Sequence, residues 1–167
     1  MFKTEQENFW NSDFGNDYIA RNNTPEILKN KKHLFKNIFK KIDSNIESII
    51  EFGANIGLNL NAIESVITNS PKITAVEINL ESCKFLNKNN NYKVINDSIL
   101  NYDTTTKNDF VLTMGLLIHL DPSILNDVYD ILYNTSSKYI CIAEYYNPTP
   151  ISIDYRGEKN KLFKRDF

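Results

Sequence analysis

The sequence has few cysteines, few glycines and no strong excess of either charge. Its only cysteines, Cys83 and Cys141, stand alone and lack the spacing of a metal site. They fit a reduced, cytoplasmic setting. The formal net charge of −2 argues against the basic surface that nucleic-acid-binding proteins usually carry. We therefore expect no metal and no nucleic-acid partner.

Long hydrophobic runs and a signal peptide are also missing. No apolar stretch reaches the roughly 20 residues of a membrane span, and Met1–Asn8 is polar and acidic, unlike a signal peptide. Hydrophobic residues make up 41% and charged residues 24% of the chain, which is typical of a soluble globular protein. A chain of 167 residues suits one domain with a single core. No membrane partner is expected.

The one basic cluster of the sequence falls on a predicted helix. Thr24 is expected to cap this helix, and Pro25 to stand at its first position. The apolar residues of the helix recur at helical spacing and should pack on a sheet. The lysines are Lys29, Lys31, Lys32, Lys36, Lys40 and Lys41. A solvated helix face explains them better than a phosphate-binding track.

Short apolar segments alternate with helical patterns along the rest of the chain. Strands are predicted over residues 48–52, 72–77, 92–96, 110–114 and 138–144. Helices are expected from Leu58, from Leu80, and from Pro122 after an N-cap at Asp121. This alternation predicts an α/β fold with a doubly wound parallel sheet, in the order 3-2-1-4-5. In such sheets, ligands bind at the carboxyl ends of the strands.

The turn after the first strand carries an informative spacing. Glu51 lies near the end of the strand, and Gly53 and Gly57 bracket the turn. Glycine suits this turn because it reaches positive φ and lets a ligand approach the backbone. A dinucleotide-binding G-x-G-x-x-G pattern would need glycine where Asn55 and Leu58 stand, which disfavours an NAD-dependent oxidoreductase. An ordinary strand-to-helix turn of another α/β protein stays an alternative on this motif alone.

The pattern E-x-G-x-N-x-G resembles motif I of the class I S-adenosylmethionine-dependent methyltransferases. In that family the turn passes beside the methionine part of the cofactor, and the acid helps to hold its cationic end. A carboxylate after the second strand usually accepts ribose hydroxyls. An acid after the third strand accepts the adenine amine, although a plain turn is equally open for Asp-Ser. The predicted cofactor-binding residues are Glu51, Gly53, Asn55, Gly57, Glu77, Asp97, Ser98 and Met114.

Further motifs resemble a narrower family, the methylases associated with pseudaminic acid biosynthesis. They are Phe9 to Asn22, Gly115 to Pro122, Glu144 to Pro150, Tyr155 to Gly157 and Leu162 to Phe167. The resemblance runs from about residue 9 to the last residue. It implies methyl transfer from S-adenosylmethionine to a small molecule, most simply a nonulosonic sugar or its precursor. It divides the single domain, 1–167, into an aromatic cap and helix (1–45), a cofactor-binding core (46–147) and an acceptor-side tail (148–167).

Methyl transfer to a sugar hydroxyl requires a group that accepts the proton. His119 is the leading candidate because it follows the fourth strand, although packing before the next helix explains it equally well. Tyr146 is a second catalytic candidate. The resemblance also implies acceptor binding by Tyr145, Asn147, Tyr155 and Arg156, and a lid made of Tyr18, Arg21 and Asn22. For Trp10, core packing is the simpler interpretation.

One departure from the family concerns the end of the sheet. Class I methyltransferases continue after the fifth strand with a helix and an antiparallel two-strand hairpin, and this sheet is expected to lack the last two strands. The fifth strand reads as buried on both faces, so its open edge needs a cover, either from residues 148–167 or from a second copy in a homo-oligomer. A non-catalytic or truncated S-adenosylmethionine-binding module, acting as a subunit, is the alternative function.

Overall fold

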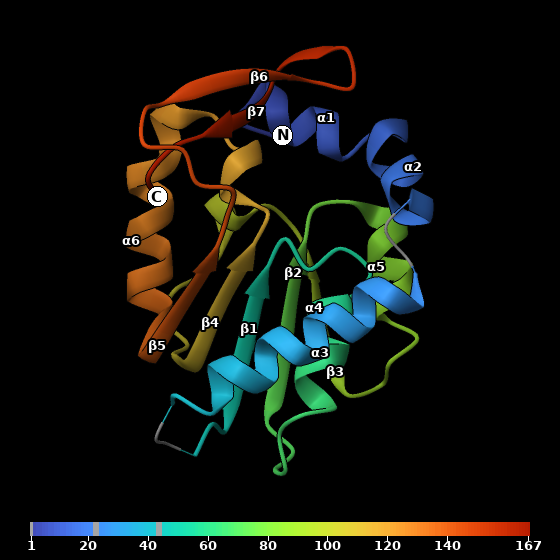
Figure 1. Cartoon of the computed structure of the whole chain (residues 1–167), viewed down its shortest axis with the longest axis vertical. Helices are drawn as coiled ribbons and strands as arrows, with labels where there is room; N and C mark the ends of the chain where they lie inside the picture. The colour runs from blue at the N-terminus through green and yellow to red at the C-terminus, as the bar shows by residue number, and fades with distance from the viewer. Residues whose placement is uncertain (1, 22–23, 43–44) are drawn as a thin grey trace.

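The computed structural model describes residues 2–21, 24–42 and 45–167 of the chain. Five parallel strands form the central sheet in the order β3-β2-β1-β4-β5 (Figure 1). The strands are β1 (Ser48–Phe52), β2 (Lys72–Glu77), β3 (Tyr92–Asn96), β4 (Asn108–Met114) and β5 (Ser136–Ala143). This arrangement confirms the predicted α/β class and the predicted strand order.

Helices precede and connect the strands. They are α1 (Glu5–Trp10), α2 (Asp13–Arg21), α3 (Pro25–Phe39), α4 (Leu58–Glu64), α5 (Leu80–Leu86), α6 (Leu125–Thr135) and the 3-10 turns η1 (Ile99–Asn101), η2 (Leu117–His119) and η3 (Pro122–Ile124). Helix α3 begins as predicted, because the Thr24 side chain accepts a hydrogen bond from the Ile27 N–H. Asp121 caps η3, so the predicted helix opens with a 3-10 turn before α6.

The core consists of two apolar layers, one on each face of the sheet. On one face, Phe35 of α3 and Leu60 of α4 are fully buried with Ile49 of β1. On the other face, Val128 of α6 packs with Ile50, the next residue of β1. Consecutive strand residues point to opposite faces, so β1 needs apolar side chains on both. This is why β1 reads as a continuous hydrophobic run.

Strand β5 is less buried than its sequence predicts. Ile140 and Ile142 are each 39% exposed, and Tyr139 and Cys141 are only partly buried on the opposite face. Within the described residues β5 pairs with β4 alone, so one of its edges is open. An edge strand has a neighbouring strand on one side only, which leaves its side chains half covered. The expectation of burial on both faces was therefore wrong.

The chain continues after the sheet in a hairpin that the sequence analysis did not predict. Strands β6 (Ile151–Tyr155) and β7 (Glu158–Lys164) pair with each other as a separate antiparallel sheet, so the central sheet ends at β5 as expected. Arg156 and Gly157 form the turn, with φ values of 54° and 89°. Figure 1 shows the hairpin lying beside α1, over the carboxyl ends of the strands. It does not add a strand to the open edge of β5.

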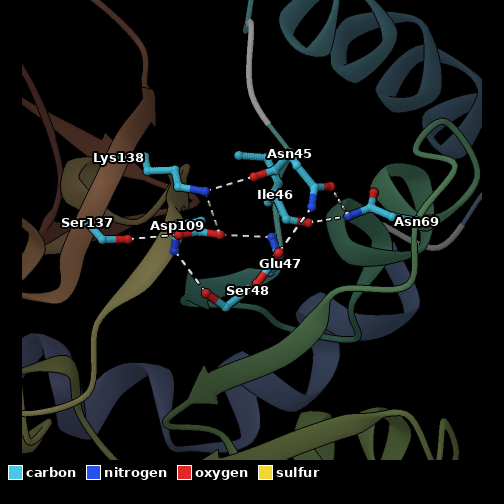
Figure 2. Close-up of polar contacts among 8 residues, drawn as sticks. All are labelled: Asn45, Ile46, Glu47, Ser48, Asn69, Asp109, Ser137 and Lys138. Carbon is cyan, nitrogen blue, oxygen red and sulfur yellow. Dashed lines mark hydrogen bonds and ion pairs between the residues drawn. The ribbon is translucent and has the colours of Figure 1, made fainter.

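A polar network ties the strands together at the opposite, amino-terminal end of the sheet (Figure 2). Asp109 accepts a hydrogen bond from the Glu47 N–H at 2.8 Å and from Ser137 Oγ at 2.9 Å. The same carboxylate pairs with Lys138 Nζ at 3.1 Å, and Lys138 also donates to the Asn45 carbonyl at 2.8 Å. The network joins the segment before β1 to β4 and β5, and it lies far from the ligand-binding end.

Across the described ranges, no helix is long and apolar enough to span a membrane.

Candidate functional site

A cavity of about 910 Å³ lies at the carboxyl ends of the central strands, beneath α1, α2 and the β6–β7 hairpin. The predicted residues that line it are Gly53, Asn55, Glu77, Asp97, Ser98, Met114, His119, Tyr18, Tyr145, Tyr155 and Arg156. The structure therefore brings together residues from the carboxyl ends of all five strands of the central sheet. One cavity joins the predicted cofactor residues to the predicted acceptor residues.

The turn from β1 to α4 has a backbone that only certain residues can adopt. Gly53, Asn55 and Gly57 have φ values of 73°, 47° and 81°, in the left-handed region that glycine and asparagine tolerate best. A Cβ on Gly57 would lie 2.8 Å from Leu86 Cδ2, so a larger residue would disturb the packing of α5. Gly57 itself does not line the cavity. Its role is to let the turn fold back on the core.

Glu77 holds this turn against the end of β2. Its two carboxylate oxygens accept hydrogen bonds from the backbone N–H groups of Asn55 at 2.7 Å and Asn79 at 2.8 Å. Burial raises the pKa of Glu77, and these hydrogen bonds oppose the rise. Each carboxylate oxygen can accept more than one hydrogen bond. The side chain is therefore positioned to accept hydrogen bonds from hydroxyl groups of a ligand in the cavity.

Asp97 and Ser98 form a turn, which is one of the two roles that the sequence left open. Asp97 Oδ1 accepts hydrogen bonds from the Ser98 N–H at 2.7 Å and from Asn101 Nδ2 at 2.8 Å. Ser98 in turn caps η1 by accepting a hydrogen bond from the Leu100 N–H. Both residues also line the cavity. The turn role is thus observed, and it leaves the Asp97 side chain at the cavity wall.

A chain of three polar side chains connects α3 to the end of β1. Lys31 Nζ donates to Asn59 Oδ1 at 2.6 Å, and Asn59 Nδ2 donates to Glu51 Oε1. Glu51 is 0% exposed, and burial raises its pKa to about 8, with Asn59 and Lys31 opposing the rise. Burial likewise lowers the pKa of Lys31. Glu51 Oε2 has no hydrogen-bond partner among the described residues.

Lys31 corrects the sequence analysis, which placed it on a solvated helix face. The residue is half-buried and lines the cavity, and its Nζ also lies 3.7 Å from Met114 Sδ. The α3 helix crosses the sheet near the β1–α4 turn, so a long side chain on that side reaches the strand ends along its apolar stem. Asn59 was missed as well. Its signal in the sequence is a polar residue between Leu58 and Leu60, two positions after the glycine that ends the turn.

His119 lies on the acceptor side of the cavity, between two aromatic rings. Its ring centroid is 4.5 Å from that of Trp10 and 5.1 Å from that of Tyr155. Nδ1 lies 2.7 Å from the Lys161 carbonyl oxygen. A carbonyl only accepts, so Nδ1 carries the proton and Nε2 has a free lone pair. Burial lowers the pKa of His119 to about 4, although the bond to Lys161 opposes this change.

Several predicted acceptor residues do not line the cavity. Tyr146 is 65% exposed, and Asn147 donates to the nearby Thr149 carbonyl. Arg21 packs its guanidinium 5.1 Å from the centre of the Phe14 ring. Asn22 lies outside the described residues. The structure therefore brings neither Tyr146 nor Arg21 to the cavity wall.

The path of the chain after β5 explains the exposure of Tyr146. Glu144, the first residue after the strand, turns its side chain toward η2 and accepts hydrogen bonds from the N–H groups of Leu116 and Leu117, both at 2.9 Å. The backbone then leaves over the edge of the sheet.

Across the described parts of the chain, no group of three or more His, Cys, Asp and Glu side chains is arranged to hold a metal ion.

Comparison with known proteins identifies the fold. No protein-family model and no curated sequence matches this chain. Solved structures do match. The plantazolicin methyltransferase BpumL in complex with SAH is 18% identical with a TM-score of 0.65, over 84% of this chain and 57% of that chain. This chain thus spans a little over half the length of BpumL.

Two other matches have the same architecture. The sugar N-methyltransferase KedS8 from Streptoalloteichus is 12% identical with a TM-score of 0.66, over 84% of this chain and 61% of that chain. The 1,6-didemethyltoxoflavin-N1-methyltransferase of Burkholderia thailandensis is 11% identical with a TM-score of 0.68, over 96% and 69%. At these identities the likeness establishes the fold alone, a Rossmann-like α/β fold shared with methyltransferases. The matches lend no support to the pseudaminic acid resemblance.

Proposed function

We propose that this chain binds S-adenosylmethionine in the cavity and transfers its methyl group to a small molecule. The observation that carries the proposal is the convergence of Glu77, Asp97 and Met114 from three different strand ends on a single cavity. Glu51 is buried behind Asn59, which lines the same cavity. The fold is shared with proteins crystallised with SAH. The cavity is also large enough for a cofactor and an acceptor together.

The residues on the cofactor side fit the groups of S-adenosylmethionine. Glu77 supplies acceptors for ribose hydroxyls, and Asp97 for the adenine amine. Lys31 provides a cation for the methionine carboxylate. Glu51 lies behind Asn59, and its Oε2, which has no partner among the described residues, is an acceptor for the methionine ammonium. Gly53 and Met114 also line the cavity on this side. When bound, the cofactor supplies a methyl group on a cationic sulfur.

The residues on the acceptor side position the acceptor and accept a proton. Positioning is the main requirement of an in-line methyl transfer. His119 is neutral above its lowered pKa, so its Nε2 is available as a hydrogen-bond acceptor or base. Tyr18, Tyr145 and Tyr155 surround this side of the cavity, and Arg156 at the hairpin turn can pair with an anionic group of the acceptor. An acceptor role for Tyr146, Asn147 and Arg21 would require their side chains to turn toward the cavity on binding, and Asn22 lies outside the described residues.

Two finer parts of the proposal rest on the sequence alone. The identification of the acceptor as a nonulosonic sugar or its precursor rests on the motifs between residues 9 and 167. The inference of a cytoplasmic location rests on the isolated cysteines. A non-catalytic S-adenosylmethionine-binding module is the second candidate function, and the observation that favours it is a sheet that ends at β5.

Calorimetry with S-adenosylmethionine and with NAD tests the cofactor, with Glu77→Gln as the informative variant. We expect binding of S-adenosylmethionine, weakened by about 1–3 kcal/mol in the variant through loss of charged hydrogen bonds. The exposed pair of Glu81 and Lys84 offers a control, because Glu81→Gln should leave binding unchanged. Tight binding of NAD alone would overturn the proposal. Binding of S-adenosylmethionine without a 14-dalton mass gain on any acceptor would favour the non-catalytic module.

A further inference from the structure

Helix α1 has three buried polar atoms that lack hydrogen-bond partners within the described residues. They are Gln6 Oε1, Glu7 Oε1 and Trp10 Nε1. A buried polar group without a partner costs about 1–3 kcal/mol, so three on one short helix need an explanation. Residues 6 and 7 lie four and three positions before residue 10, so the three share one side of the helix. All three line the cavity.

The same side chains are fixed by their other atoms and cannot rotate to find partners. Gln6 Nε2 donates to the Asn160 carbonyl of β7 at 3.1 Å, which leaves the amide oxygen facing away from that bond. Glu7 Oε2 accepts hydrogen bonds from the N–H groups of Lys3 and Thr4, both at 2.7 Å, in a capping box. Gln6 and Glu7 are only 3% and 5% exposed. Their second oxygens are therefore held as acceptors that the protein does not use.

The chemistry of these atoms specifies a complementary ligand group. Two acceptors from one side of α1, one of them a carboxylate oxygen, match a group with several N–H donors and a developing positive charge. Lys161, the buried cation of the hairpin, is occupied by its ion pair with Glu5. Aromatic rings adjoin the site, since the Trp10 and Phe14 centroids lie 5.6 Å apart and the Phe14 and Tyr155 centroids 5.8 Å apart. Ring faces attract cationic groups.

We propose that the methyl acceptor is a small molecule with a primary amine beside a hydroxyl or carbonyl oxygen, and that Glu7 and Gln6 of α1 recognise the amine. The neighbouring oxygen of the small molecule accepts a hydrogen bond from Trp10 Nε1–H. The inference rests on the proposed methyl transfer and specifies its acceptor. A hydroxyl in place of the amine would offer a single donor to two acceptors, and after methylation and loss of its proton it would leave no positive charge beside the carboxylate.

The charge balance of the reaction supports an amine at this position. The lone pair of the neutral amine forms the new N–C bond, the C–S bond breaks, and its electron pair stays on sulfur. The positive charge thereby moves from sulfur to nitrogen, and the Glu7 carboxylate stabilises the ammonium that forms. The two N–H groups of the neutral amine donate to Gln6 Oε1 and Glu7 Oε1, which leaves its lone pair free for the transfer. The ammonium keeps its protons until the product leaves for solvent.

Matched amine and alcohol pairs test the inference. The probes are glucosamine with glucose, and phenylalaninol with 3-phenylpropane-1,2-diol, each incubated with the full chain and S-adenosylmethionine and followed by mass spectrometry. We expect a 14-dalton gain on at least one amine and on neither alcohol. Calorimetry in the presence of SAH should show the same preference in binding. Methylation or binding of the alcohols as strong as that of the amines would overturn the inference, as would binding of neither amine.

The variant Glu7→Gln tests the residue itself. Glutamine keeps an oxygen for the Thr4 and Lys3 N–H groups, and it is accepted at this position of a capping box, so α1 should still form. The KM for the amine should rise at least tenfold, while the affinity for S-adenosylmethionine stays within twofold of the unmodified chain. The matched control is Glu81→Gln on the exposed surface of α5. An unchanged KM would refute the role of Glu7. Failure of S-adenosylmethionine binding in the unmodified chain would instead refute the proposed function.

Discussion

Replacing Glu51 by glutamine should stabilise the ligand-free chain and weaken its binding of S-adenosylmethionine. Glu51 is fully buried, and burial raises its pKa to about 8 from the ordinary value of 4.5. Asn59 donates to Glu51 Oε1, and Lys31 donates to Asn59. Glutamine keeps the acceptor for Asn59 and nearly the same volume. The change therefore removes a titrating group without opening a cavity.

The sign of the effect follows from proton binding in the two states. Between pH 4.5 and about 8, the unfolded chain releases the proton of this residue while the folded chain keeps it. The free energy of unfolding therefore falls as the pH rises through this window. At about 1.4 kcal/mol per pH unit, the loss between pH 4.5 and pH 7 is roughly 3 kcal/mol. For a chain of this size, that corresponds to roughly 6–12 °C in Tm.

Urea unfolding of both proteins at pH 5, 7 and 8.5 measures this difference. The unmodified chain should lose stability relative to Glu51→Gln as the pH rises. Calorimetry at pH 7 in buffers of different ionisation enthalpy adds a second measurement. A bound cation beside Glu51 favours its charged form, so binding of S-adenosylmethionine should release up to about one proton from the unmodified chain and none from Glu51→Gln. Parallel stability curves for the two proteins would refute the reasoning.

Three further predictions concern the base, the polar network and the open edge. Because the pKa of His119 is lowered to about 4, its ring should stay neutral in a pH titration followed by NMR from pH 8 down to about 5, and a titration centred near pH 6.5 would contradict this assignment. Asp109→Asn should destabilise the chain by about 1 kcal/mol in urea unfolding, through loss of the Lys138 pair, while calorimetry shows unchanged S-adenosylmethionine binding. The open edge of β5, with Ile140 and Ile142 partly exposed, should lead to self-association in sedimentation experiments at micromolar concentration; a clean monomer would exclude a second copy as its cover.

The parts of the fold that the sequence predicted correctly depend on local signals. The bounds of β1, β2 and β3 agree with the prediction because each is a short apolar run between clear turn residues. The start of α3 follows from Thr24 and Pro25, which act within one helical turn. The positive φ values of Gly53 and Gly57 were likewise expected from the spacing of the turn. Each of these features involves residues that are close together in the chain.

The features that the sequence did not predict depend on contacts between distant segments. His119 contacts Lys161 across 42 positions, and Gln6 contacts Asn160 across 154. Gln6 and Glu7 look like surface residues of a polar helix, and only the hairpin above them shows that they are buried. The hairpin was missed because its turn places Arg156 in the left-handed region, where asparagine or glycine is the usual signal.

This difference explains why the cofactor can be inferred from the sequence more readily than the acceptor. The cofactor side is built from turns that directly follow strands, so a carboxylate or a glycine can be assigned from its place after an apolar run. The acceptor side is built from both ends of the chain, where Lys161 of β7 pairs with Glu5 of α1. The carbonyl of Lys161 also accepts a hydrogen bond from His119 Nδ1. The helix that recognises the acceptor and the hairpin that sets the histidine tautomer are thus one structural unit. A change that loosens the Glu5–Lys161 pair should therefore disturb acceptor recognition and the orientation of His119 together, while the cofactor side, which shares none of these contacts, keeps its geometry.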